Sequence, residues 1–288
     1  MTAARIFPRA NFTEALALVL VIVACGGKSS RADSPDATSG GASSHAAGGA
    51  LVRGGSDARG GESGGADSIA GAPAVETTCS ELEYSSPFVE LSDQASLEQL
   101  RAVTVLRGHL LITGDVTDLS PLACLTTVAE QLSIVQTTEL RSLRGLDNLT
   151  SIGEHSGALL VIAENGALES LAGLERLTRI ASASDGSANY DAGSLDISNN
   201  PALRTTQGLA SLRRVGKFVD IARNASLRDL TGLDLLLSVP PLASFRIVDN
   251  PEVQTCEAER IAASLDPLEV TILGGAPDRG DGSCEPFR

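Results

Sequence analysis

Apolar residues recur along this chain in a pattern that repeats about every 25 residues. Five segments share a short run of alternating apolar and polar residues, followed by apolar residues at every third position: 110–128, 132–152, 160–180, 195–215 and 219–239. The alternation, as in Leu195-Asp196-Ile197, is typical of a strand with one buried face. Each segment therefore predicts one unit of a stacked repeat, which buries its apolar face only against its neighbours.

One isoleucine stands at the centre of each predicted strand, and we expect these isoleucines to stack: Ile112, Ile134, Ile162, Ile197, Ile221, Ile247 and Ile272. Three residues after four of them comes an asparagine: Asn165, Asn200, Asn224 and Asn250. Asparagine tolerates left-handed backbone and bonds nearby main-chain groups. We interpret the four as shaping the turn that leaves each strand and as an internal amide ladder. A row of asparagines that contacts a ligand is the alternative.

The second half of each repeat has a different period. Leu168, Leu171, Leu174 and Leu177 are spaced by three, and an α-helix would mix spacings of three and four. A spacing of three predicts an arc of 3₁₀-like or polyproline-like backbone. Short helices are expected to cap the two ends of the stack. One carries Leu97, Leu100 and Val103 after a capping Ser92 or Asp93, and the other spans 256–265.

The run Leu-Asp-Ile-Ser-Asn-Asn-Pro-Ala-Leu at 195–203, followed by Gly208-Leu209, resembles the receptor L domain, and the resemblance extends over about 105–284. Two residues separate Asn200 from Leu203, where ordinary leucine-rich repeats have one. The resemblance implies a mostly β fold for 77–288, a right-handed β-helix or solenoid of six to seven coils. It also implies a role in recognition, since the family forms ligand-binding lobes of insulin- and growth-factor-type receptors and occurs in bacterial surface lipoproteins.

The N-terminal region has the order of a lipoprotein leader. Arg5 and Arg9 precede a short apolar run, and Ile22-Val23-Ala24-Cys25 resembles the lipobox, in which the cysteine thiol receives diacylglycerol. We therefore expect a signal peptide at 1–24 and lipidation of Cys25. Residues 25–76 are rich in Gly, Ala and Ser, and this composition predicts a disordered tether. The expected location is the bacterial cell envelope, at the outer membrane or cell surface.

Four further cysteines are Cys79, Cys124, Cys256 and Cys284. An even number outside the leader fits two disulfides in an oxidising compartment, and four cysteines allow three pairings. By position at the two ends of the repeat, we expect Cys79 to pair with Cys124 and Cys256 with Cys284.

Charge and histidine spacing reduce the range of functions that we expect for this chain. The net charge of −14 argues against binding to nucleic acid. The three histidines lack metal-ligand or nucleophile–base spacing, so we expect no metal, no cofactor and no enzyme activity.

The longest interval between repeats contains an insertion at 181–193 that we interpret as a loop contacting a partner, with Asp185, Asn189, Tyr190 and Asp191 as candidate residues. Its alternating Asp and Asn resemble a calcium loop, but Tyr190 stands where the turn needs glycine, and no glutamate ends the loop.

Our hypothesis is a lipid-anchored envelope protein that presents a non-catalytic recognition domain to a protein or glycan partner. Two alternatives stay open: a structural envelope lipoprotein without a dedicated ligand, and a carbohydrate-active β-helix enzyme.

Overall fold

The computed structural model describes residues 79–154, 158–180, 193–237 and 242–277. The chain divides into two units, Met1–Ile69 and Ala70–Arg288, and every described residue belongs to the second. The expected signal peptide and tether, at 1–24 and 25–76, lie outside the described residues. Within the described ranges, no helix has both the length and the apolar character that a membrane crossing requires.

The mostly β fold is confirmed, with one α-helix in the described part of the chain. Parallel strands form a single open sheet of twelve strands. The longer strands make what we call the main ladder: β1 (Glu83–Asp93), β2 (Val105–Asp115), β4 (Gln131–Thr137), β6 (Leu159–Ala163), β8 (Ser194–Ser198), β10 (Phe218–Ala222), β11 (Ser244–Val248) and β12 (Val270–Leu273).

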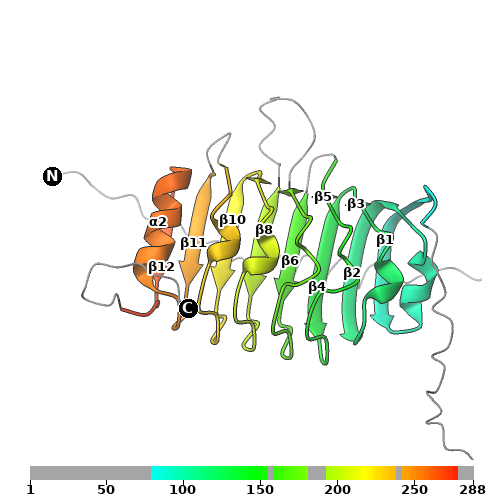
Figure 1. Cartoon of the computed structure of the whole chain (residues 1–288), viewed down its shortest axis with the longest axis horizontal. Coiled ribbons are helices and arrows are strands. Elements are labelled where there is room, and N and C mark those ends of the chain that lie inside the picture. Colours follow the sequence, from blue (N-terminus) through cyan, green and yellow to red (C-terminus); the bar gives the residue numbers. More distant parts are fainter. Residues whose placement is uncertain (1–78, 155–157, 181–192, 238–241, 278–288) are drawn as a thin grey trace, which may run out of the picture. The chain divides into compact units, whose positions relative to one another are not determined.

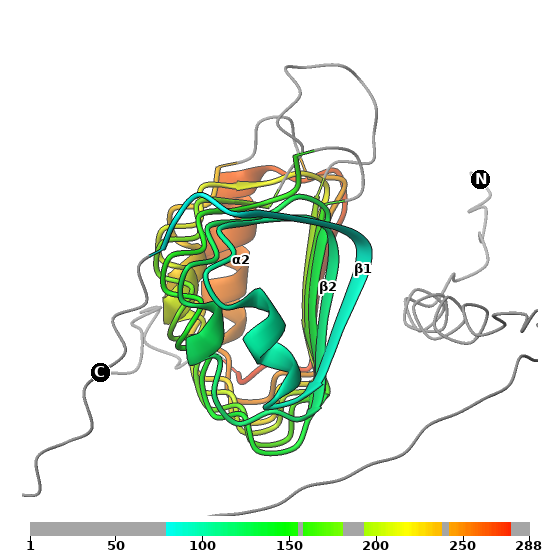
Figure 2. The same cartoon turned by 90° about the vertical axis from the view of Figure 1, so that its right-hand side faces the viewer.

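Two-residue strands form the short ladder, which joins the sheet through β2: β3 (Thr127–Val128), β5 (Ser151–Ile152), β7 (Arg179–Ile180) and β9 (Arg214–Val215). Four 3₁₀ helices and helix α2 complete the described elements: η1 (Ser96–Leu100), η2 (Ser120–Leu122), η3 (Gln207–Leu209), η4 (Thr231–Leu233) and α2 (Thr255–Leu265). In Figure 1 the main-ladder strands lie side by side from β1 to β12, next to α2. Figure 2 looks along the stack and shows that successive repeats follow nearly the same outline.

The predicted stacking of isoleucines is confirmed. Each central isoleucine pairs in register with the next, from Ile112 and Ile134 to Ile247 and Ile272. Six of the seven are buried, and Ile272, on the last strand, packs partly buried against the core. Burial of one such side chain contributes about 1.5–3 kcal/mol. The stacked column explains how an aliphatic chain with 3% aromatic residues builds a continuous core.

The leucine-rich half of the repeat has 3₁₀ character, which is one of the two backbone forms predicted for the arc. The backbone N–H of Leu174 donates to the carbonyl of Leu171, and the N–H of Leu177 donates to that of Leu174. Repeats approach each other closely here. A Cβ on Gly173, whose φ is +112°, would lie 2.0 Å from the carbonyl oxygen of Leu143. Glycine is therefore required at this position by both space and backbone conformation.

The N-terminal end differs from the sequence prediction. Strand β1 adds a repeat that we did not predict, with Leu91 at the isoleucine position opposite Ile112. The expected short cap helix is present as the 3₁₀ helix η1 with Leu97 and Leu100 buried, but it ends at Leu100 and does not extend to Val103. The Asp93 carboxylate accepts a hydrogen bond from the Ser96 N–H (2.8 Å), which holds the turn into η1.

At the C-terminal end, α2 confirms the predicted helix. Ala258, Ile261, Ala262 and Leu265 are buried as expected from their helical spacing. Glu257, in the first turn of α2, is also buried, and its carboxylate accepts the backbone N–H of Leu230 at 2.8 Å. This bond ties the helix to the preceding repeat.

Candidate functional site

The four asparagines singled out in the sequence form a buried ladder across consecutive repeats. The side-chain oxygen of Asn200 accepts the backbone N–H and the Nδ2–H of Asn165, both at 3.1 Å. Asn224 receives the same pair from Asn200, and Asn250 receives it from Asn224. At the other end, Thr137 donates its backbone N–H and its hydroxyl to Asn165.

Each asparagine also donates to the carbonyl of the isoleucine in the previous repeat, as Asn200 does to Ile162 at 2.8 Å. The side chains thus use their hydrogen-bonding groups within the fold, and they are almost fully shielded from solvent. This arrangement supports the interpretation of the four asparagines as an internal amide ladder. The left-handed backbone of each turn lies one residue earlier, at Glu164, Asn199, Arg223 and Asp249, and not at the asparagines themselves.

Only some of the other residues singled out in the sequence lie in the part of the chain that the structure describes. A disulfide joins Cys79 to Cys124 at the N-terminal end of the repeats. Cys256 is disulfide-bonded as well. Cys25 and Cys284 lie outside the described residues, and so does the candidate partner loop with Asp185, Asn189, Tyr190 and Asp191. Lipidation, the Cys256–Cys284 pairing and the loop's role therefore stay predictions.

The outward side of the main ladder carries a polar arrangement that the sequence analysis missed. We call its central line of side chains the outer row: Glu90, Leu111, Ser133, Val161, Asp196, Asp220, Arg246 and Thr271. The positions in β2, β4 and β6 hold small or apolar residues, and each of these is buried. The next three positions hold charges on adjacent strands.

Asp196 and Asp220 occupy identical positions on β8 and β10, one strand spacing apart, or about 4.8 Å. Arg246 follows on β11 and donates from Nη1 to both oxygens of Asp220, at 3.0 and 2.6 Å. Asp220 exposes 6% of its surface. Asp196 differs, because its Oδ1 is buried and has no hydrogen-bond partner among the protein groups.

Burial dominates the electrostatics of this carboxylate pair. Desolvation raises the pKa of Asp196 to about 6, against a contrary effect of the hydrogen bond from Ser198, and the negative charge of Asp220 raises it further. Burial also raises the pKa of Asp220, although the guanidinium of Arg246 opposes the shift. The positive charge of Arg223 lowers both pKa values. The site therefore holds one compensated carboxylate and one that lacks a full set of partners.

The signal for this site was present in the sequence. Leu-Asp-Ile at 195–197 and Val-Asp-Ile at 219–221 place aspartate at one phase of consecutive repeats. The alternation of apolar and polar residues predicts one buried face and does not distinguish these aspartates from other polar positions on the strands. The structure shows that Leu111, Ser133, Val161 and Asp220 of this row are buried although they lie on the outward face, which periodicity alone does not reveal.

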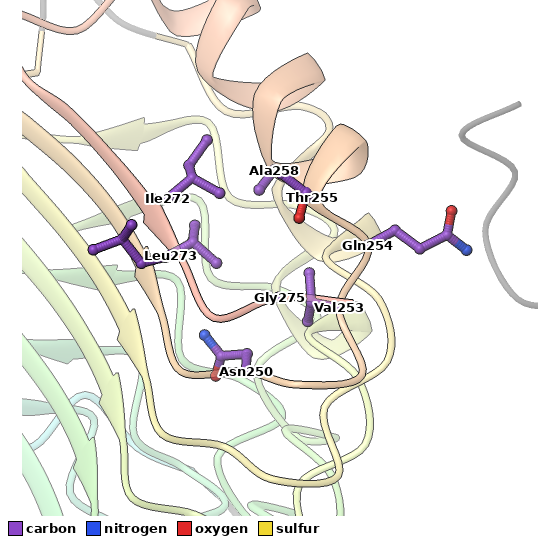
Figure 3. Close-up of a pocket in the computed structure, with 9 residues that line it drawn as sticks. Asn250, Val253, Gln254, Thr255, Ala258, Ile272, Leu273 and Gly275 are labelled. Atoms are coloured by element: carbon purple, nitrogen blue, oxygen red, sulfur yellow. The ribbon is translucent and has the colours of Figure 1, made fainter. Parts of the chain in front are cut away.

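A small hollow lies at the C-terminal end, between α2 and the last strands, where it is surrounded by Asn250, Val253, Thr255, Ala258 and Ile272 (Figure 3). It is mostly apolar in lining and has no room for a water molecule. We interpret it as a packing defect beneath the cap and not as a ligand site.

The described residues show no group of three side chains able to hold a metal ion. The Nε2 of His109 lies 2.7 Å from a carboxylate oxygen of Glu130.

Comparison with known proteins finds a family match for part of the repeat region. Residues 104–211 match the family model of the receptor L domain, within the range of about 105–284 expected from the sequence. No curated protein matches the chain. The matched segment includes Asp196, whereas Asp220 and Arg246 lie beyond it. The match suggests a ligand-binding, non-catalytic domain.

Proposed function

We propose that this chain is a non-catalytic recognition protein whose protein or glycan ligand binds on the outward face of the main ladder, around Asp196 and Asp220. The match to the receptor L domain supports a binding role. The observation that carries the location is the buried Oδ1 of Asp196, which has no hydrogen-bond partner.

A carboxylate oxygen that is shielded from water without a donor is unfavourable for folding. The fold does not require a charge at this position, because Ser133 and Val161 fill the same position in earlier repeats. A ligand that brings a hydrogen-bond donor or a cationic group to the accessible part of Asp196 would satisfy the oxygen once the carboxylate turns toward it. This is our reason for placing the contact here.

We propose further that the described repeats belong to a right-handed β-helix of six to seven coils, held to the bacterial envelope by a lipid on Cys25 and a tether at 25–76. The parallel register of the main ladder supports stacked coils. The leader pattern at 1–24 supports the anchor.

One observation favours a second candidate, a carbohydrate-active enzyme. Two adjacent carboxylates, one with a pKa raised to about 6, resemble an acid and base pair. Against this, Arg246 binds both oxygens of Asp220, so this carboxylate is not free to act on a substrate. The other alternative is an envelope protein with a structural role only, in which case the outer row has no ligand.

The test is a binding screen of the full chain against glycan arrays and cell-surface proteins, with Asp196→Asn beside it. The matched control is Glu139→Gln, which removes one negative charge from an exposed side chain. We expect a ligand that binds the unaltered chain and the control alike and binds Asp196→Asn at least tenfold more weakly. Equal binding by all three would refute the site, and turnover of a glycan would favour the enzyme.

Anchoring is tested separately. Replacing Cys25 by serine should release the protein from membranes, and surface proteolysis of intact cells should cleave the unaltered chain. A Cys25→Ser chain that still sediments with membranes would refute lipidation.

A further inference from the structure

Four basic side chains gather on the short ladder and the segment that follows it. Arg179 of β7 pairs in register with Arg214 of β9, so two arginines are stacked one strand spacing apart. Arg213 precedes Arg214 directly, and Lys217 follows before β10 begins. Arg213 and Arg214 are exposed, and Arg179 and Lys217 are half-buried. We call these four residues the basic corner.

The basic corner lacks ion pairs with carboxylates among the described residues, in a chain with a net charge of −14. Like charges at paired positions of adjacent strands repel each other. Repulsion of this kind persists in a fold when it is offset elsewhere or when a partner brings the opposite charge.

Another line of charges in the same molecule shows the contrast. At the start of the leucine arcs, arginine and glutamate side chains of neighbouring repeats neutralise each other. Arg141 and Arg204 both contact Glu169, and Arg228 contacts Glu252. The stack thus accommodates compensated charges readily, which makes the uncompensated basic corner a feature that the repeat itself does not demand.

Earlier repeats confirm that neutral residues serve at these positions. Thr127 and Ser151 precede Arg179 in the same register, and their hydroxyls bond each other at 3.2 Å. In the adjoining line, the hydroxyls of Thr150 and Thr178 bond the carbonyl of the preceding repeat, and Arg213 takes the next position. Cations replace hydroxyls only in the later repeats.

Exposed leucines border the basic corner. Leu237 forms a parallel bridge with Arg214, its backbone N–H donates to the Arg213 carbonyl at 2.8 Å, and 58% of its surface is exposed. Leu235 exposes 45%, and the two flank the buried Leu236. A surface that combines guanidinium groups with exposed leucines suits the boundary between lipid headgroups and acyl chains. An acidic glycan would match the charges but would leave the leucines in water.

We infer that the basic corner, with Leu235 and Leu237, docks the repeat domain on the surface of a membrane that contains anionic phospholipid. Arginine suits this role because its planar fork binds phosphate oxygens with two hydrogen bonds. The chain as a whole has a net charge of −14, so repulsion from anionic lipid would favour an orientation with this corner toward the bilayer. The contact is independent of the lipid expected on Cys25 and of the ligand proposed at Asp196.

The experiment is co-sedimentation of the full chain with vesicles, carrying Cys25→Ser so that no acyl chain is attached. Vesicles of phosphatidylcholine alone are compared with vesicles that also contain phosphatidylglycerol. The test variant changes Arg179, Arg213, Arg214 and Lys217 to glutamine. The control changes Arg141, Arg144, Arg204 and Arg228 to glutamine, which removes the same charge from elsewhere on the repeats. Any contribution of the leader is common to all the chains.

We expect the chain and the control to bind vesicles that contain phosphatidylglycerol, and the test variant to bind at least tenfold more weakly. Added salt should weaken the interaction, and Leu237→Ser should weaken it on its own. Equal binding by the test and control variants would overturn the inference. Equal binding of the unaltered repeats to vesicles with and without phosphatidylglycerol would overturn it as well. Binding of an acidic polysaccharide by the control variant but not by the test variant, with no binding of either to vesicles, would overturn the inference and assign the corner to a glycan instead. Asp196→Asn should leave vesicle binding unchanged, which separates this result from the ligand site.

Discussion

The side-chain oxygen of Asn224 accepts two hydrogen bonds from Asn200, one from its backbone N–H at 3.0 Å and one from its Nδ2–H at 3.3 Å. Because Asn200 serves Asn165 in the same way, each amide is both donor and acceptor in one buried chain. Removal of one member leaves polar groups unsatisfied on both sides of it.

We predict that Asn200→Ala lowers the free energy of unfolding by about 2–4 kcal/mol, because buried donors on Asn165 and a buried acceptor on Ile162 lose their partners. Urea denaturation measures the change. The control is Asn199→Gly, at a neighbouring position with φ of +56° that glycine adopts without strain. An Asn200→Ala chain as stable as the control would show that the ladder contributes nothing.

A second prediction concerns the close approach of repeats at the arcs. Gly173→Ala should destabilise the fold by about 2 kcal/mol or more, because the methyl group would overlap the Leu143 carbonyl and the φ of +112° is unfavourable for alanine. Gly166→Ala is the matched control, since nothing lies within 4 Å of a Cβ there. Thermal unfolding of the two variants should therefore differ clearly, and equal midpoints would contradict the argument.

The repeat was predictable because its signals are local and recur. The isoleucine register, the leucine arcs and the helix at the C-terminal end follow from spacing alone, and pairing of Ile162 with Ile197 holds despite the insertion between them. Strand β1 is hard to predict because leucine stands at the isoleucine position, at Leu91, and because Pro87 lies within the strand. A strand accepts proline only at a sheet edge or a bulge, and the register of β1 shifts between Ser85 and Phe88.

The outer row and the basic corner were harder to predict. Asp196 and Arg179 look like ordinary polar positions on strands, and their significance arises from the neighbours they lack. The residues that do lie beside them come from repeats that are 24 or more residues away in the sequence. The lack of a compensating charge therefore appears only when the register is known. Periodicity thus predicts the scaffold, whereas the candidate sites depend on which charges the register leaves uncompensated.

A third prediction addresses the Cys79–Cys124 disulfide, whose cysteines are separated by 45 residues in the sequence. Changing both cysteines to serine should lower the free energy of unfolding by about 3–4 kcal/mol, because the unfolded chain gains the entropy of an open loop. Denaturation of the double variant measures the loss directly. Since Cys256 is also disulfide-bonded, reductant should lower the stability of the double variant further. A double variant with unchanged stability would show that the bridge is dispensable for the fold.

The last prediction links the stability of the fold to Asp196. Its pKa of about 6 in the folded chain lies above the ordinary value of 3.8, so the folded state binds the proton more tightly than the unfolded state does. The stability contributed by this group is therefore present at low pH and lost as the pH rises through about 6. At neutral pH the ionised carboxylate destabilises the fold.

Asp196→Asn should consequently raise the free energy of unfolding at pH 7.5 by about 1–3 kcal/mol, and the two chains should converge near pH 4. Urea denaturation across this range measures the difference, with Glu139→Gln again as the control for removal of a charge. A difference that does not vary with pH would contradict the proposed burial of the carboxylate. If the same substitution stabilises the chain and abolishes ligand binding, Asp196 is retained at the expense of stability, which is the signature of a functional residue in a fold that does not need it.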